Sequence, residues 1–295
     1  MKTIFTIMAL LAALVPKANA QSPTSSSTAN EGTALLMVHF GTTHDDTRQL
    51  TIDAVNQLAQ QQFPQMEMRE AYTSRIVIKR LAQRGIVKKT PLEMLLQLRS
   101  EGYQHIIVQT THIIPGEEYE TLLNDVRQVE HLFANIHVGK PLLYSLEDCR
   151  KVGTLFNDLA SPYLQASKQT HVVLVGHGTE HPANAIYSQM DAMLKDLNPR
   201  IHIGTIEGYP DFDRVLENLK RAKARRVILM PFMFVAGDHA KNDISIEWKD
   251  ALEKEGIQVE LRLEGLGQNP QIQSLFMEHI LRQFGIRKSS KNLVI

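Results

Sequence analysis

An internal repeat limits the folds that this chain can adopt more than any other feature of its sequence. Val38-His39-Phe40-Gly41-Thr42 aligns with Val175-Gly176-His177-Gly178-Thr179 at an offset of 137 residues. Glu70-Ala71-Tyr72 aligns with Glu207-Gly208-Tyr209 at the same offset. Agreement of two separate segments indicates that each half of the chain forms the same kind of unit.

The repeat continues with a shift. Residues 115–118 line up with residues 236–239 at an offset of 121, and the first half carries an extra segment around residues 76–84. We therefore expect two similar lobes that face each other across a cleft, with one additional element in the first lobe.

Each half alternates short apolar runs with longer amphipathic ones, which is typical of a parallel sheet with crossover helices. Helical spacing of apolar residues is clear over residues 122–133, 186–197 and 272–280. The expected strands are residues 34–40, 66–72, 105–110, 136–139, 171–175, 201–206, 226–230 and 258–263. The fold class is then α/β, with two related lobes that each hold a parallel sheet flanked by helices.

The ends of the chain differ from this body. Residues 1–20 combine Lys2, an apolar run too short to span a bilayer, and Ala18-Asn19-Ala20, the pattern of a secretory signal peptide. We expect a flexible leader at residues 21–33, an N-terminal lobe at 34–145, a C-terminal lobe at 146–285 and a tail at 286–295. The mature protein is then expected in the periplasm, without a membrane span.

Charge and missing motifs exclude several kinds of partner. Loss of Lys2 and Lys17 with the signal peptide leaves 30 basic against 32 acidic residues. We expect no nucleic acid as partner, because neutralising phosphates needs a basic face. No GxxxxGK[ST] or GxGxxG run is present, so no nucleotide cofactor is expected. The single cysteine, Cys149, cannot form an internal disulfide, and the sequence leaves the oligomeric state open, a homo-oligomer included.

Three residues of the second half follow expected strands and carry metal-binding groups. His177 follows residues 171–175 in a glycine-flanked turn, Glu207 ends residues 201–206, and His239 follows residues 226–230 across a loop. Ligands of parallel sheets bind beyond the carboxyl ends of the strands. Two imidazoles and a carboxylate suit divalent Co, Ni, Zn or Fe and leave coordination positions open. From spacing alone, ordinary hydrogen-bonded histidines remain the alternative.

The same argument selects weaker candidates for contact with a ligand. In the first half, Phe40 ends the first expected strand and Thr42 follows it, and His112 and Glu117 follow the third. Glu117 could equally cap a helix, whose positive end favours carboxylates. His181 precedes Pro182 and is either a ligand contact or a helix-start residue. The alignment makes Phe40, Glu70 and Glu118 the counterparts of the trio, so we expect one metal site, in the C-terminal lobe.

These segments resemble one family closely. The chain is similar to the anaerobic sirohydrochlorin cobaltochelatases, relatives of ferrochelatase, from residue 34 to about residue 280. The resemblance is carried by FGT at residues 40–42, REAYTSR at 69–75, HIIPGEEY at 112–119, GHGTEHPAN at 176–184, EGYP at 207–210, MPFM at 230–233 and AGDHAKND at 236–243.

The resemblance implies a lyase-type chelatase that inserts a divalent metal into a tetrapyrrole held between the lobes. It implies a cobalt site matching His177, Glu207 and His239, with His177 as general base, and Co²⁺ as metal, with Fe²⁺, Ni²⁺ and Zn²⁺ as alternatives. Because cobalamin precursors are made in the cytoplasm, an expected export signal leaves a second hypothesis open. In it, the same cleft carries haem or metal ions in the periplasm without turnover.

Overall fold

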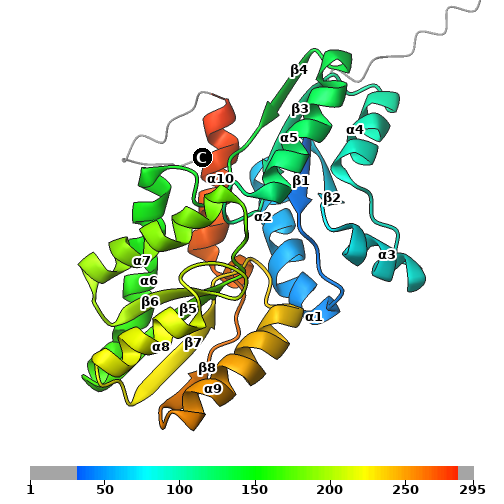
Figure 1. The fold of residues 1–295 in the computed structure, drawn as a ribbon. Coiled ribbons are helices and arrows are strands. Elements are labelled where there is room, and N and C mark those ends of the chain that lie inside the picture. Colours follow the sequence, from blue (N-terminus) through cyan, green and yellow to red (C-terminus); the bar gives the residue numbers. More distant parts are fainter. Residues whose placement is uncertain (1–31, 285–295) are drawn as a thin grey trace, which may run out of the picture.

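The computed structural model describes residues 32–284, so the expected signal peptide and tail lie outside the described residues. Two four-stranded parallel sheets stand side by side, each with helices on both faces (Figure 1). Strand order is β2-β1-β3-β4 in the first sheet and β6-β5-β7-β8 in the second, so the two sheets share one topology. The expected fold class is confirmed.

The N-terminal lobe is built from β1 (Thr33–His39), α1 (Asp45–Arg48), η1 (Gln49–Asp53), α2 (Ala54–Gln62), β2 (Glu67–Tyr72), α3 (Arg75–Gln83), α4 (Pro91–Ser100), β3 (His105–Thr110), α5 (Glu117–Val129), η2 (Glu130–Leu132) and β4 (Asn135–Val138). The expected strands of this lobe end within one residue of the observed ones. Helix α4 shows why such boundaries are readable, since Thr90 and Glu93 form a capping box in front of Pro91.

The C-terminal lobe contains α6 (Leu146–Ala166), β5 (Thr170–Gly176), η3 (Pro182–Asn184), α7 (Ala185–Leu197), β6 (Ile201–Thr205), α8 (Phe212–Arg221), β7 (Arg226–Pro231), η4 (Ala240–Trp248), α9 (Lys249–Lys254), β8 (Gln258–Leu261), η5 (Leu266–Gln268) and α10 (Pro270–Gln283). Its expected strands agree with the observed ones within two residues. No helix among residues 32–284 has the length and apolar character needed to cross a membrane.

Strand registers correct one part of the repeat. Val38 pairs with Ala71 in the first sheet, and Val175 pairs with Gly204 in the second, so β2 and β6 correspond at an offset of 133 and not 137. Glu70 lies inside β2, opposite Met37, whereas Glu207 lies beyond the end of β6. The expected equivalence of Glu70 and Glu207 is therefore wrong.

Backbone hydrogen bonds identify the true counterpart of Glu207. Its N–H donates to the carbonyl of His177 at 2.8 Å, and the N–H of Ser74 donates in the same way to the carbonyl of Phe40 at 3.1 Å. Since Phe40 corresponds to His177, Ser74 corresponds to Glu207. The other alignment holds: Val38 pairs with Thr110 and Val175 with Pro231, at the expected offset of 121.

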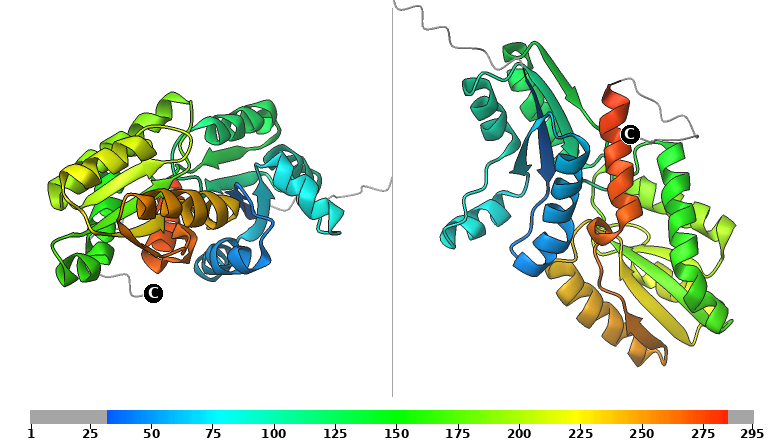
Figure 2. Two further views of the ribbon diagram at one scale, coloured as in Figure 1. Left: turned by 60° about the horizontal axis from the view of Figure 1, so that its bottom comes forward. Right: turned by 180° about the vertical axis from the view of Figure 1, so that it is seen from behind.

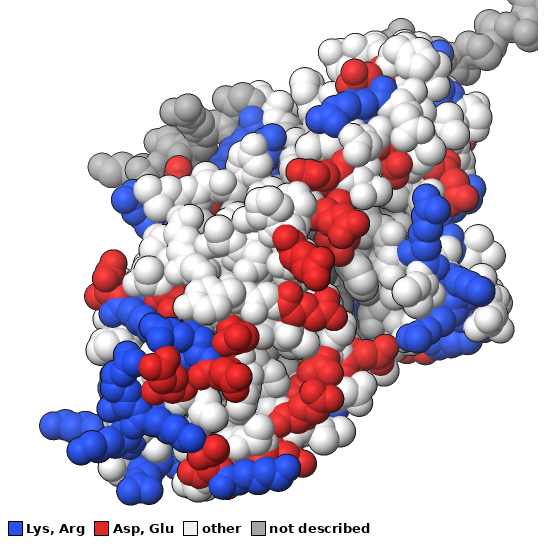
Figure 3. All heavy atoms as spheres, in the orientation of Figure 1, with Lys and Arg blue, Asp and Glu red and all other residues white. Residues whose placement is uncertain are grey.

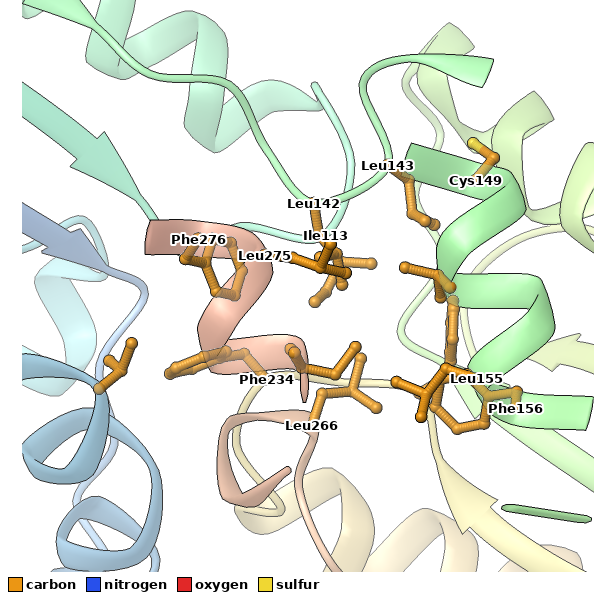
Figure 4. Packing of buried hydrophobic residues seen from close by; sticks show 14 of the residues in the cluster. Ile113, Leu142, Leu143, Cys149, Leu155, Phe156, Phe234, Leu266, Leu275 and Phe276 are labelled. Atoms are coloured by element: carbon orange, nitrogen blue, oxygen red, sulfur yellow. The ribbon is translucent and has the colours of Figure 1, made fainter. Parts of the chain in front are cut away.

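The last helix ties the two lobes together. Although α10 follows the C-terminal sheet in sequence, it packs against β3 and α2 of the N-terminal lobe as well as against α6 (Figure 2). Phe276 of α10 is fully buried and lies edge-on to Phe234 at 5.7 Å, in a cluster that includes Ile113 and Leu142 from the first lobe and Phe156 from the second (Figure 4). One of the three hydrophobic clusters among the described residues therefore spans both lobes, and each lobe has a further cluster of its own.

Candidate metal centre

The turn after β5 fixes the position of His177. Gly178 adopts a φ of +80°, and a side chain there would meet the backbone nitrogen of Gly208 at 2.7 Å. Glycine is required because it tolerates both the left-handed backbone and the close approach. This turn clamps the segment after β6 against the segment after β5, and it directs His177 and Glu207 to the same edge of the sheet.

His239 is placed by the segment that follows β7. It directly precedes η4, whose π-helical hydrogen bonds begin at Ala240. The Nδ1 of His239 lies 2.5 Å from the Oδ2 of Asp243, one turn further along. A carboxylate that accepts the Nδ1 proton of a metal-binding histidine fixes the tautomer and leaves the Nε2 lone pair free for the ion.

The imidazoles of His177 and His239 meet through their Nε2 atoms, which are 3.1 Å apart, with the rings nearly perpendicular. The Nδ1–H of His177 donates to the carbonyl oxygen of Gly178 at 2.9 Å. When both rings are neutral and these contacts hold their protons on Nδ1, both Nε2 atoms present lone pairs to each other. Two facing lone pairs repel unless a cation lies between them. Two Nε2 ligands at ~2.0–2.1 Å from a tetrahedral metal would be separated by roughly 3.3 Å, close to the observed distance.

Glu207 lies at the flank of this pair. Its Oε2 is 3.7 Å from the Nδ1 of His177, on the ring edge away from the two Nε2 atoms, and its side chain is 60% exposed. Within residues 32–284, no group of three or more His, Cys, Asp or Glu side chains is gathered closely enough to hold a metal ion as it stands. The centre is thus a histidine pair with a free carboxylate beside it, and Glu207 must turn toward the Nε2 atoms to join them.

The N-terminal lobe brings its turn against this centre. Phe40 is exposed after β1, whereas Thr42 is buried and accepts the N–H of His44. Thr42 lies next to the Cα of Gly237, two residues before His239. Phe40 therefore offers an aromatic surface at the junction of the lobes, and Thr42 shapes the turn that carries it.

His112 is held by hydroxyl groups on both sides. Its Nδ1 is 2.6 Å from the Oγ1 of Thr110 and its Nε2 is 3.2 Å from the Oγ1 of Thr73. Burial lowers the pKa of His112 to about 3, so the ring is neutral at physiological pH. In this state it is a fixed neutral group and not a proton acceptor.

The remaining candidates lie at helix starts. Glu117 is an exposed first residue of α5. His181 caps η3, since its Nδ1 accepts the N–H of Ala183, and its Nε2 faces Glu120 of the first lobe at 3.1 Å. His181 therefore links the two lobes, a role that sequence reasoning did not find.

Sequence reasoning also missed the partners on the opposite side of His239. Asp238 accepts a hydrogen bond from the Nε2 of His44 at 2.6 Å, which joins the turn after β1 to the segment before η4. From the sequence, Asp243 was identified only as the last residue of the AGDHAKND motif at residues 236–243. Spacing from His239 could have found it, because residues four apart meet on one face of a helix.

An open cavity of about 780 Å³ lies elsewhere, along the outer edge of β2. Its lining includes Glu70, whose carboxylate is bound by Asn56 at 3.0 Å and by Lys88. Glu70 is thereby committed to the N-terminal lobe and does not take part in the histidine centre.

Two α/β lobes of one topology, with a histidine pair beyond the strand ends of the second lobe, define the class of two-lobed α/β metal-handling proteins. Residues 33–284 match the family described as "Cobalt chelatase (CbiK)". The chain belongs to this family, as the sequence motifs indicated.

Two curated relatives support the assignment. The sirohydrochlorin cobaltochelatase of Salmonella typhimurium (strain LT2) is 36% identical over 252 residues, covering 84% of this chain and 94% of the relative. Sirohydrochlorin cobaltochelatase CbiKC of Nitratidesulfovibrio vulgaris (strain Hildenborough) is 31% identical over 236 residues, covering 78% of this chain and 83% of the relative.

Solved structures support the fold. SirB from Bacillus subtilis with Fe³⁺ gives a TM-score of 0.60 at 15% identity, covering 85% of this chain and 95% of SirB. CbiX, described as the terminal enzyme of sirohaem biosynthesis in denitrifying bacteria, gives a TM-score of 0.51 at 17% identity, covering 84% of this chain and 98% of CbiX.

Proposed function

We propose that this chain is a periplasmic metallochelatase that inserts Co²⁺ into sirohydrochlorin or a closely related tetrapyrrole. The observation that carries the proposal is the pair of Nε2 lone pairs of His177 and His239, which face each other at 3.1 Å with both Nδ1 protons engaged elsewhere. The relatives named sirohydrochlorin cobaltochelatase support the choice of metal and macrocycle.

The reaction exchanges two pyrrole N–H protons for one divalent ion. In the proposed mechanism, Co²⁺ is a substrate that first binds the Nε2 atoms of His177 and His239, with Glu207 turning to contribute its charge. Open coordination positions then face the macrocycle nitrogens. Transfer succeeds only if the protein ligands release the ion, and imidazoles bound through one nitrogen can do so one at a time.

The same lone pairs accept the protons that leave the pyrrole nitrogens. As the ion moves to the macrocycle, the Nε2 atoms of His177 and His239 become free, and each can accept one of the two pyrrole protons, with His177 as the general base of the first transfer. Glu207 lies beside the Nδ1 of the same ring, so the imidazolium can lose its Nδ1 proton to this carboxylate, which passes it to solvent. Asp243 stabilises positive charge on His239 through the Nδ1–H contact.

A carrier of haem or metal ions is the alternative, and the expected export signal is the observation that favours it. A carrier binds its ligand in fixed proportion, whereas a chelatase turns over. Mature protein, residues 21–295, is mixed with excess sirohydrochlorin and Co²⁺, and the absorption spectrum is followed. We expect many equivalents of product per chain, well above the spontaneous rate measured without protein.

Controls assign the activity to the centre. His177→Ala protein at the same concentration should reduce insertion to the spontaneous rate, and Fe²⁺ in place of Co²⁺ measures the metal preference. If the wild type yields no more than one equivalent of product, the carrier hypothesis holds and the chelatase proposal fails.

The periplasmic location has a separate test. Cleavage after Ala20 predicts a mature chain that begins at Gln21 and is released with the periplasmic fraction. Mass spectrometry of the fractionated protein reads the first residue directly. An intact chain starting at Met1 in the cytoplasmic fraction would contradict export and leave the chemistry unaffected.

A further inference from the structure

Helix α3 has no counterpart in the C-terminal lobe. Between β2 and β3 lie 32 residues, whereas 20 residues connect β6 to β7, which are joined by the single helix α8. Leu81 is the one residue of α3 that is buried, and the only element against which α3 makes more than sparse contacts is β2. The helix is therefore an addition to the repeated fold, attached to the core through Leu81 with Val77 and Ile78 packed beside it.

One face of α3 is directed at the metal centre. Ile76, Arg80 and Arg84 are spaced four residues apart and so lie along one side. Arg84 donates to the carbonyl of Thr43 at 2.6 Å, which fixes the end of α3 to the turn after β1. Arg80 reaches across to the C-terminal lobe, where its Nη1 is 3.4 Å from the Oδ2 of Asp238, the neighbour of His239.

Arg80 is available for another partner. Its side chain is 58% exposed, and an ion pair of this exposure and length contributes little to stability. Asp238 does not depend on it, because the carboxylate also holds the Nε2 of His44 at 2.6 Å. Ile76, one turn before Arg80, leaves 66% of its surface in contact with solvent.

Apart from Lys241, which lies beside His44 and Asp46, the charged groups around this face are mainly acidic. Figure 3 shows acidic side chains along the junction of the lobes and basic side chains gathered over α3 at the right edge. Glu117, Glu120, Glu207 and Asp238 all belong to segments at this junction. Such a field attracts a divalent cation but repels a ligand with several carboxylates, unless a cationic group is provided for them.

We propose that α3 recognises the acidic side chains of the tetrapyrrole, with Arg80 binding a peripheral carboxylate and Ile76 covering the edge of the macrocycle. The inference rests on the proposed function and adds the group that selects polycarboxylate tetrapyrroles. A guanidinium matches a carboxylate through two parallel N–H donors. On binding, Arg80 exchanges Asp238 for the substrate carboxylate, and Asp238 stays with His44.

The test measures binding without metal. Titration of sirohydrochlorin into the mature protein gives a Kd, which we expect Arg80→Glu to raise about tenfold, as expected for loss of one charged contact at a solvent-exposed rim. Raising the salt concentration should weaken binding to the wild type more than to the variant. The matched control is Arg221→Glu, which reverses the charge of an exposed arginine at the end of α8, far from the centre in its ion pair with Glu217. Its Kd should stay within about twofold of wild type.

A second variant separates recognition from support of the loop. If Arg80 acted only by holding Asp238 beside His239, Asp238→Asn would weaken sirohydrochlorin binding as much as Arg80→Glu does. If Arg80 binds the substrate, Asp238→Asn frees it, and binding should be unchanged or tighter. A wild-type Kd in Arg80→Glu, or an equal loss in both variants, overturns the proposal.

Other readouts keep this inference apart from the chelatase proposal. Co²⁺ titrated alone should bind Arg80→Glu at least as tightly as wild type, because the histidine pair is unchanged and the added negative charge attracts the cation. A wild type that binds sirohydrochlorin through Arg80 but shows no turnover would refute the chelatase proposal and leave the role of α3 standing. Conversely, a wild type that turns over, but whose Kd for sirohydrochlorin is unchanged by Arg80→Glu, would refute the role of α3 and leave the chelatase proposal standing.

Discussion

The two lobes share strand order, the hydrogen bonds that follow each strand and a left-handed glycine at the same place, Gly41 in one and Gly178 in the other. They differ in the side chains that this frame presents. Where the C-terminal lobe has His177, Glu207 and His239, the N-terminal lobe has Phe40, Ser74 and Glu118. The shared backbone therefore presents equivalent positions in both lobes, and the side chains at three of them place the proposed site in the C-terminal lobe.

This difference also gives the two lobes different roles in the proposed function. In this proposal, the C-terminal lobe supplies nitrogen lone pairs for an ion, and the N-terminal lobe supplies an exposed aromatic ring and the cationic face of α3. A flat macrocycle between them would meet metal ligands on one side and recognition groups on the other.

The largest expected effect compares equivalent positions in the two lobes. His239→Ala should lower the rate of Co²⁺ insertion at least about a thousandfold, equivalent to ~4 kcal/mol in the barrier, because one of two lone pairs is lost. Glu118→Gln, at the matching position, should stay within about threefold of wild type. Rates are measured by absorption at equal folded concentration, checked by circular dichroism. Similar losses in both variants would show that the lobes share the chemistry.

The next prediction concerns the helix that joins the lobes. Phe276→Ala removes a fully buried ring from the shared core and should lower the free energy of unfolding by ~3–5 kcal/mol. Phe284→Ala, at the exposed end of α10, is the matched control and should cost under about 1 kcal/mol. Urea denaturation should show one transition for the wild type, since one core spans both lobes. Two separate transitions would mean that the lobes are independent units.

A smaller effect is expected from the carboxylate behind His239. Asp243 corresponds to the buried Leu122 of the first lobe, so at this position only the C-terminal lobe has a carboxylate. Asp243→Asn should weaken Co²⁺ binding about 10- to 100-fold with little change in the unfolding free energy. Calorimetric titration measures it against Asp250→Asn, an exposed acidic residue of α9. Equal affinities of the two variants would exclude a positioning role.

The smallest effect concerns buried histidines that both lobes contain. Burial lowers the pKa of His39 to about 4 in the first lobe, and those of His171 and His202 to about 4 and about 3 in the second. The unfolded state takes up these protons at a higher pH than the folded state does. The contribution of these histidines to the free energy of unfolding is therefore full above about pH 6.5 and is lost as the pH falls toward 4. Replacing His202 by Leu should reduce the stability loss between pH 7 and pH 5 by ~1–2 kcal/mol. The free energy of unfolding is measured by urea denaturation at each pH. A pH dependence equal to that of the wild type would show that His202 is not buried as a neutral group.

The sequence predicted the frame of the molecule well, for a physical reason. Strands of a sheet covered on both faces are continuous apolar runs, such as residues 171–175, and their limits are visible without tertiary information. The motifs also led to His177 and His239, which the structure brings together. Glu70 was misassigned because the residues after it are similar in type to those after Glu207. Strand register depends on backbone hydrogen bonds, which cannot be read from the sequence.

What the sequence could not predict are contacts between distant segments. The approach of Arg80 to Asp238 and of His181 to Glu120 depends on how the lobes are set against each other. That arrangement in turn depends on α10, whose apolar face was readable but whose two packing partners were not.

The return of α10 to the first lobe has a consequence for the order of synthesis. The N-terminal lobe leaves the ribosome first, yet the face of β3 that α10 covers stays open until the last helix has been made. His279 and Arg282 of α10, which contact the buried Asp148, are synthesised equally late. The first half of the chain therefore cannot complete its native packing while the second half is still being translated. The proposed export of an unfolded chain would be helped by this delay, because the helix that completes the packing would cross the membrane after both sheets.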